Sequence, residues 1–174
     1  MKLVKPIDLF NNVMKATSKQ QRLLGLDVGN KYIGLSVSDT NKRIASPLSV
    51  LVRKKSNIEL IAGDFQRLVS ELSLAGLIVG YPFRKQSKLS LELHVEYFVK
   101  ELGETGKLDG LCYTYWDEHY TSKCVESLLH PLDLHPVEAK TMMDKFAAVG
   151  ILQGYLDSMQ RNQRSKTGKE GDSC

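Results

Sequence analysis

A short apolar run that ends in a carboxylate is the feature that most constrains the fold of this chain. Residues 22–27 read Arg-Leu-Leu-Gly-Leu-Asp, and Val28-Gly29-Asn30-Lys31 follows directly. An apolar run of this length before a Gly-Asn pair is typical of a buried strand that closes on a tight turn. The sequence therefore predicts that Asp27 ends one strand and that a second strand runs back from the turn.

Strand and helix patterns then alternate along the chain. Residues typical of strands occupy 32–38, 43–52, 76–80 and 111–116, and helical spacing of apolar residues marks 58–72, 89–102, 121–129 and 136–159. Pro47 indicates an edge position for the third strand. This order predicts an α/β fold with a mixed five-stranded sheet, in which an antiparallel three-strand meander precedes two βα crossovers, flanked by helices.

Length and charge predict one domain with two polar ends. The 174 residues carry a net charge of +4, of which residues 1–22 hold +4 and residues 160–174 hold +2, so that 23–159 is mildly acidic. We therefore expect a basic N-terminal extension over 1–21, one domain over 22–159 and a disordered polar tail over 160–174. Three irregularly spaced cysteines and the lack of a run of ~20 apolar residues predict free thiols, a reducing compartment and no membrane span.

Three carboxylates occupy positions where the surrounding residues are apolar. Asp27 ends the first strand, Glu118 follows the aromatic strand 111–116, and Asp144 lies in a helix rich in apolar residues. If the crossovers bring them together, such hard oxygen ligands suit magnesium or manganese, and two ions ~4 Å apart suit phosphodiester hydrolysis. The alternatives are ordinary: Asp27 as a turn residue, Glu118 as a helix cap, and Asp144 paired with a neighbouring lysine.

Four blocks of the sequence resemble the YqgF-type family, whose members are described as Holliday-junction resolvases and as nucleases that mature the small-subunit ribosomal RNA precursor. The blocks are residues 24–39, 77–82, 117–122 and 144–157, in the family's order, and together they span about 22–158. The resemblance implies a ribonuclease H-like fold and a nuclease domain over 22–159. It also implies that Asp27, Glu118 and Asp144 form the family's acidic triad and act in metal-dependent phosphodiester hydrolysis.

Contacts to nucleic acid are predicted less directly. The family usually has Arg where this chain has His119, and a glycine-bearing loop where this chain has the basic segment 82–88. Charge and helix-start amides favour six residues as nucleic-acid ligands, namely Lys31, Arg84, Lys85, His119, Thr121 and Ser122. Each also has an ordinary interpretation as a turn, cap or solvated loop residue.

The function expected from these patterns is that of a magnesium- or manganese-dependent nuclease acting on structured nucleic acid. Processing of the 5′ end of the small-subunit ribosomal RNA precursor is the favoured reaction, and Holliday junction resolution is the alternative. A noncatalytic nucleic-acid-binding module on the same fold is the alternative that His119 and the loop 82–88 suggest. The expected partner is an RNA precursor or branched DNA, the expected state a monomer or homodimer, and the expected location the cytoplasm, with a plastid or mitochondrion as the other choice.

Overall fold

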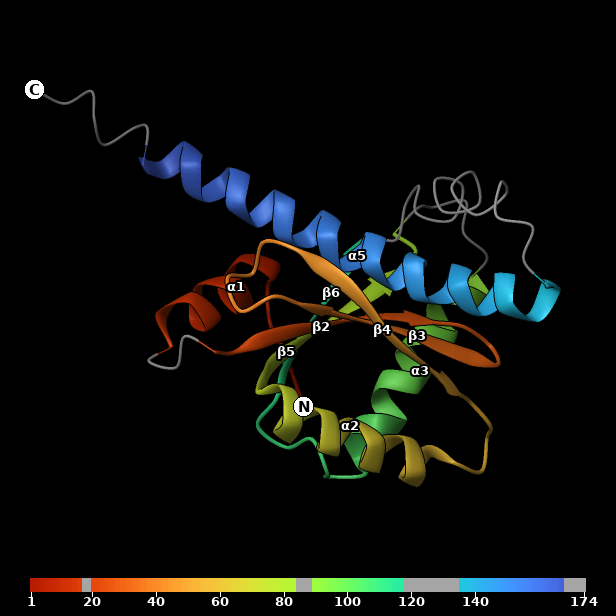
Figure 1. Cartoon of the computed structure of the whole chain (residues 1–174). Helices are drawn as coiled ribbons and strands as arrows, with labels where there is room; N and C mark the ends of the chain where they lie inside the picture. Colours follow the sequence, from red (N-terminus) through yellow and green to blue (C-terminus); the bar gives the residue numbers. More distant parts are fainter. Residues whose placement is uncertain (17–19, 84–88, 118–134, 168–174) are drawn as a thin grey trace, which may run out of the picture.

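The computed structural model describes residues 1–16, 20–83, 89–117 and 135–167 (Figure 1). A six-stranded mixed sheet forms its centre, with the strands in the order β1-β6-β5-β2-β3-β4. Strands β1, β6, β5 and β2 are parallel, and β2, β3 and β4 form an antiparallel meander. The strand bounds are β1 Lys2–Leu3, β2 Arg22–Val28, β3 Tyr32–Ser38, β4 Ala45–Val52, β5 Leu74–Tyr81 and β6 Cys112–Asp117.

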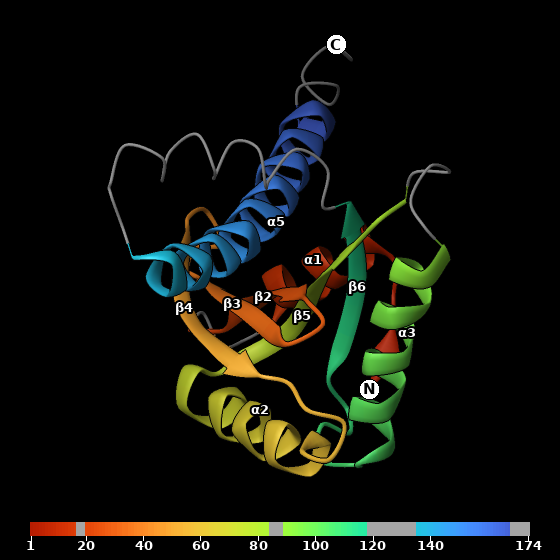
Figure 2. The same cartoon turned by 90° about the vertical axis from the view of Figure 1, so that its right-hand side faces the viewer.

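Helices cover both faces of this sheet. Helices α2 (Ile58–Leu72) and α3 (Leu89–Glu104) lie on one face, and α1 (Pro6–Lys15) and α5 (Pro136–Thr167) lie on the other (Figures 1 and 2). Because both faces are covered, the central strand β2 is apolar almost throughout and not alternating. None of the helices within the described ranges is long and apolar enough to cross a membrane.

Alternation along the strands separates two cores. Leu24, Leu26 and Val28 of β2 pack against α2 and α3, whereas Leu23 packs against α1 and α5. Successive side chains of a strand point to opposite faces, so Gly25 and Asp27 share the face of Leu23. Asp27 therefore points to the side of the sheet that α5 covers.

Helix α5 lies unusually close to strands β2 and β3. The Ser36 hydroxyl donates a 2.7 Å hydrogen bond to the main-chain oxygen of Ala148, which is fully buried. A Cβ added at Gly34 would overlap the main-chain carbonyl of Asp144, and one at Gly25 would lie 2.7 Å from Leu152 Cβ. Small residues on this sheet face thus let the helix backbone rest directly on the strands.

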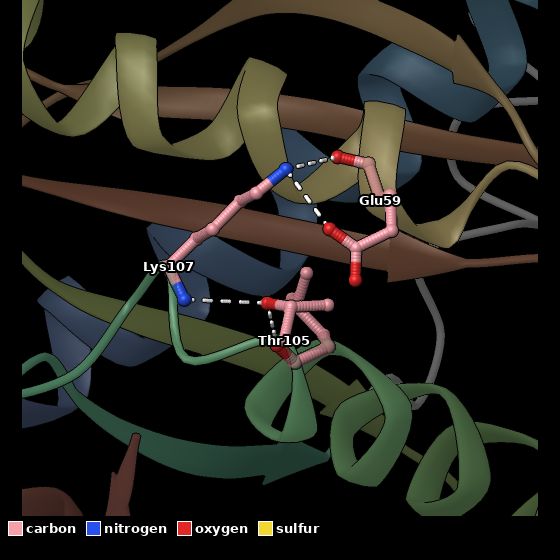
Figure 3. A network of polar contacts seen from close by, with 4 residues as sticks. Glu59, Thr105 and Lys107 are labelled. Atoms are coloured by element: carbon pink, nitrogen blue, oxygen red, sulfur yellow. Dashed lines mark hydrogen bonds and ion pairs between the residues drawn. The ribbon is translucent and has the colours of Figure 1, made fainter.

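On the opposite side, a lysine ties α2 to the segment that follows α3. Lys107 Nζ donates to the main-chain oxygen of Glu59 at 2.9 Å and lies 3.0 Å from Glu59 Oε2 (Figure 3). Thr105 Oγ1 donates to Leu102 at the end of α3 and also lies 3.4 Å from the Lys107 amide. This network holds the two helices of the α2/α3 face together at the amino-terminal turn of α2.

The first residues of the chain take part in the core, although the sequence predicted a basic extension over 1–21. Strand β1 adds a sixth strand beside β6, one more than the five predicted, and α1 buries Leu9, Phe10 and Val13. The Tyr155 hydroxyl donates a 2.8 Å hydrogen bond to Pro6, and its ring meets Phe10 edge-on at 6.2 Å between centroids. The basic charge of residues 1–21 did not indicate this packing, because α1 is amphipathic and buries only its apolar side.

The end of α5 also differs from the sequence-based expectation. The helix was expected to end at Met159, before a polar tail over 160–174, but it continues to Thr167. Gln160 Nε2 donates a 2.8 Å hydrogen bond to Lys42, which extends the contact of α5 with the β3–β4 turn. Beyond it, Arg and Gln favour helix and no Gly or Pro occurs before Gly168. Residues 168–174 lie outside the described ranges.

Substitution of Gly34 by Ala should lower the free energy of unfolding by about 2–3 kcal/mol, because the new methyl group must displace the α5 backbone. Gly63→Ala is the matched control. It lies within α2, where the nearest atom to an added Cβ is Lys107 Nζ at 3.9 Å, so it should stabilise by about 0.5–1 kcal/mol. Urea unfolding measures both; equal effects of the two substitutions would contradict the close approach of α5.

Phe10→Ala tests the contribution of α1 to the core. Loss of this buried ring should cost about 3–5 kcal/mol, the range of large-to-small core substitutions. Leu60→Ala removes an apolar side chain that is 72% exposed and should change stability by about 0.5 kcal/mol at most. Urea unfolding measures both variants, and a small effect of Phe10→Ala would show that residues 1–16 are a dispensable extension.

Candidate active site

The candidate site lies at the edge where the parallel strands β2, β5 and β6 end. Leu26 of β2 pairs with Val79 of β5, and Tyr81, the last residue of β5, pairs with Asp117 of β6. Neighbouring strands lie roughly 4.8 Å apart, so the ends of β2 and β6 are separated by about 10 Å across β5. Residues that close these strands therefore face one common edge.

Asp27 belongs to the paired part of β2, two residues before the turn. Its Cα pairs with that of Gly34 across the β2–β3 ladder, and the turn closes through a 2.9 Å hydrogen bond from the Gly29 amide to Tyr32. The Asp27 side chain is partly buried on the α5 face. A carboxylate at this depth loses part of its hydration, which favours a compensating cation or hydrogen-bond donor.

Asp144 enters the same region from α5. Ala148, Ile151 and Tyr155 follow it on one stripe of the helix, and these three residues are buried against the sheet. Ile151 reaches toward Gly80 of β5, where an added Cβ would lie 3.2 Å from Ile151 Cγ1. Two helical turns earlier, Asp144 projects in nearly the same direction, over the carboxyl-terminal part of β2.

Gly34 is the point at which the two aspartates come together. Its Cα is paired with Asp27 on one side, and its missing side chain leaves room for the Asp144 backbone on the other. Directly paired residues in an antiparallel ladder lie roughly 5 Å apart, so both aspartates occupy one small region of the sheet face. A side chain at position 34 would separate them.

The surroundings of Asp144 disfavour its charged form. Burial raises the pKa of its carboxyl above the ordinary value, and Lys140 offsets part of that shift. Lys140 itself lies over the Tyr32 ring, 5.5 Å from the centroid. The alternative offered by the sequence, in which Asp144 only pairs with a neighbouring lysine, accounts for the contribution of Lys140 but not for the burial of the carboxyl.

The other predicted site residues are placed less fully. Lys31 is exposed at the β2–β3 turn, where its main-chain oxygen accepts a 2.8 Å hydrogen bond from the Arg53 amide. Glu118, the third carboxylate predicted, lies outside the described ranges, as do five predicted nucleic-acid ligands: Arg84, Lys85, His119, Thr121 and Ser122. Within the described residues no three His, Cys, Asp or Glu side chains gather to hold a metal.

One part of the site was not singled out from the sequence. Gly34, Ser36 and Ser38 occupy alternate positions of β3 and therefore share the face toward α5. A run of small residues at a spacing of two on one strand is a sign of close approach by another backbone. These small residues could have been noticed in the sequence. Among them, Gly34 pairs with Asp27 and leaves room for the Asp144 backbone.

Comparison with known families decides the relationship. Residues 21–158 match the family model described as "RuvX: Holliday junction resolvase". The chain belongs to the RuvX family. The match covers both aspartates and confirms the YqgF-type resemblance recognised in the four sequence blocks.

Bacterial relatives of this RuvX-family chain span nearly the same length. A protein of Lachnospira eligens named "Putative pre-16S rRNA nuclease" is 31% identical over 142 residues, covering 80% of this chain and 99% of that protein. A protein of Rhodobacter capsulatus with the same name is 35% identical over 138 residues, covering 79% and 84%. Both alignments extend over most of the domain predicted from the sequence.

Solved structures confirm the fold. The RuvC resolvase of Thermus thermophilus, in a complex with a Holliday junction substrate, aligns with a TM-score of 0.50 at 15% identity, covering 80% of this chain and 96% of RuvC. The yeast mitochondrial resolvase Ydc2 aligns with the same TM-score at 12% identity, covering 92% and 89%. The RuvX-family chain thus has the ribonuclease H-like resolvase fold that the resemblance implied.

The burial of Asp144 predicts that Asp144→Asn raises the Tm of the protein at pH 7, by a few degrees at most because solvent still screens this partly buried carboxyl. The raised pKa makes the folded state bind a proton more readily than the unfolded state, so ionised Asp144 costs stability above the folded pKa. The advantage of Asn should shrink as the pH falls through that pKa toward 3.8, the ordinary carboxyl value.

Thermal unfolding with a chelator present measures this difference without metal. Glu71→Gln removes an exposed carboxyl in α2 and is the matched control. It should leave the Tm unchanged both at pH 7 and at the lower pH at which the Asp144 carboxyl is protonated. An Asp144→Asn variant that is no more stable than the parent protein at pH 7 would contradict the desolvation of this carboxyl.

Proposed function

We propose that this chain is a metal-dependent nuclease that hydrolyses phosphodiester bonds in structured RNA, and that its substrate is the 5′ region of the small-subunit ribosomal RNA precursor. The observation that supports this most directly is the convergence of Asp27 and Asp144 at Gly34, on the edge where the parallel strands end. The names of the bacterial relatives, which match over most of their length, favour ribosomal RNA as the substrate.

The donor set fits a divalent metal ion. Asp27 and Asp144 supply hard carboxylate oxygens, and the burial that raises the pKa of Asp144 is the condition in which a cation stabilises the ionised form. Asp27 and Asp144 would hold magnesium or manganese, with Glu118 as the third ligand implied by the family resemblance. When bound in such a site, these ions supply orientation and charge neutralisation for in-line attack on a phosphodiester.

The chain's own groups have separate tasks in this proposal. The two aspartates would hold the metal ions, whose charge would favour binding of the reacting phosphate at this end of the sheet. The packing of α5 on Gly34 and Ser36 keeps them at a constant separation, since neither backbone can shift without breaking the Ser36–Ala148 hydrogen bond. Lys31, exposed at the adjoining turn, supplies positive charge for the substrate backbone.

Holliday junction resolution is the second candidate. It is favoured by the description of the matching family model and by the fold shared with a resolvase that was solved on a junction. The same carboxylates would serve that reaction, but paired cuts in a symmetric junction require two copies of the site. Processing of ribosomal RNA needs only a monomer, and it takes place where ribosomes are assembled, in the cytoplasm or in an organelle.

Cleavage of a precursor 16S RNA and of a four-way DNA junction, measured side by side with magnesium or manganese, tests both candidates. The parent protein should cut the RNA, and Asp27→Asn and Asp144→Asn should each lose activity by about 10²-fold or more. Asp117→Asn is the matched control. It removes a carboxylate at the same edge, but alternation from Trp116 directs Asp117 to the α2/α3 face, so cleavage should persist.

The pattern of results separates the alternatives. Preferential cleavage of the junction would replace RNA processing by resolution. Binding of both substrates without cleavage, unchanged in both aspartate variants, would favour the noncatalytic binding module. Equal loss of activity in Asp117→Asn and Asp144→Asn would contradict the assignment of the site to the α5 face.

A further inference from the structure

A concave surface lies on the side of the β2–β3 turn opposite to the candidate active site. It encloses about 480 Å³ between the end of β4, the start of α2 and the side of α3 that carries His94, Tyr97 and Glu101. Its polar lining includes Asn30, Arg53, Lys54, Lys55, His94 and Tyr97. We refer to it as the basic pocket, since three consecutive residues of its wall are cationic.

The floor of the basic pocket is attached to the turn that follows Asp27. Arg53 donates a 3.4 Å hydrogen bond to the main-chain oxygen of Gly29, and His94 Nε2 lies 3.1 Å from the same oxygen. The Arg53 guanidinium also packs over the Phe98 ring, 4.8 Å from its centroid. The pocket is therefore held two residues from Asp27 by contacts that fix its position.

The rim of the pocket presents free positive charge. Lys54 and Lys55 are both exposed, and in the described part of the chain neither side chain takes part in an ion pair. Cations with no internal partner, next to a fixed and half-buried arginine, are suited to contact the phosphates of a nucleic acid. Glu101 is the acidic residue of the lining. Its charge raises the pKa of Tyr97 and partly offsets the lowering of the Arg53 pKa by burial.

Tyr97 supplies a flat apolar surface in the same pocket. Its side chain is 60% exposed although the ring is large. A hydrogen bond with Glu101 raises the pKa of the Tyr97 hydroxyl. An exposed aromatic ring beside lysines is the arrangement by which proteins bind single-stranded nucleic acid, because bases stack on the ring while cations contact the phosphates.

We propose that the basic pocket binds a single-stranded segment of the nucleic acid substrate, with a base stacked on Tyr97 and the flanking phosphates on Lys54 and Lys55. This inference rests on the proposed function, since it adds a single-strand site beside the cleavage site of the same substrate. The pocket contacts the main-chain oxygen of Gly29, two residues from Asp27, so the bound segment would approach the β2–β3 turn from the side opposite to α5.

Binding of a fluorescein-labelled 15-nucleotide oligouridylate to the full-length protein tests the inference. Fluorescence anisotropy is measured with a chelator present, so that cleavage does not contribute. Tyr97→Ala should weaken binding about 5- to 100-fold, while Tyr97→Phe, which keeps the ring, should stay within about twofold. Lys54→Ala/Lys55→Ala should weaken binding about tenfold and reduce the slope of log K against log salt by about 1.4, since each single-strand phosphate contact contributes about 0.7.

Lys2→Ala/Lys5→Ala is the matched charge control. Both lysines are exposed at the start of the chain, beside the first residues of β6 and away from the strand ends, and their removal gives the same net charge. This control should leave the affinity and the salt slope nearly unchanged. An equal effect of the two double variants, or no effect of Tyr97→Ala, would overturn the inference.

The outcome is independent of whether the protein cleaves RNA. Loss of oligouridylate binding in the pocket variants supports the basic pocket even if no substrate is cut. Normal oligouridylate binding in all pocket variants overturns it even if the precursor RNA is cut by an Asp144-dependent reaction. A parent protein that binds the duplex form of the probe but not the single strand also overturns it.

Discussion

The proposed active site depends on the contact between α5 and strand β3. A helix normally stands off a sheet by the length of its side chains, but here Gly34 has none and Ser36 forms a hydrogen bond directly to the helix backbone. The position of Asp144 then follows from this close approach of the α5 backbone to β3, together with the buried side chains that follow it on the helix. The fold itself therefore limits how far the two aspartates can move apart.

This arrangement places charge where the fold would otherwise bury only apolar groups. The stripe of α5 that begins with Asp144 continues through Ala148, Ile151 and Tyr155, all fully or almost fully buried. An apolar residue at position 144 would suit the stripe better, and burial accordingly disfavours the ionised carboxyl. Such a local conflict between stability and chemistry is the usual mark of a functional position.

Local patterns in the sequence were enough to predict most of the fold. The meander over β2, β3 and β4, the two crossovers and the edge position of Pro47 all follow from strand alternation, turn residues and helical spacing. In the turn between β3 and β4, the Asp39 carboxylate accepts hydrogen bonds from the Arg43 and Ile44 amides. These features depend on residues close together in sequence, where spacing alone is informative.

The features that the sequence did not predict depend on contacts between residues far apart in the chain. Helix α1 packs against Tyr155, which lies about 150 residues away in the chain, so the basic charge near it gave no hint of its place in the core. The meeting of Asp27 and Asp144 could be suggested from sequence, but Gly34 as its cause requires the register of two strands and a helix. The role of Glu118 remains a prediction, since it lies outside the described ranges.

The two edge strands of the sheet have a consequence for assembly. One edge strand, β1, is only two residues long, and the other, β4, contains Pro47, which has no amide proton to donate to a neighbouring strand. Both edge strands therefore resist extension of the sheet by a strand of another molecule. Two copies that act on one symmetric substrate would have to associate through helices or loops and not through their edge strands.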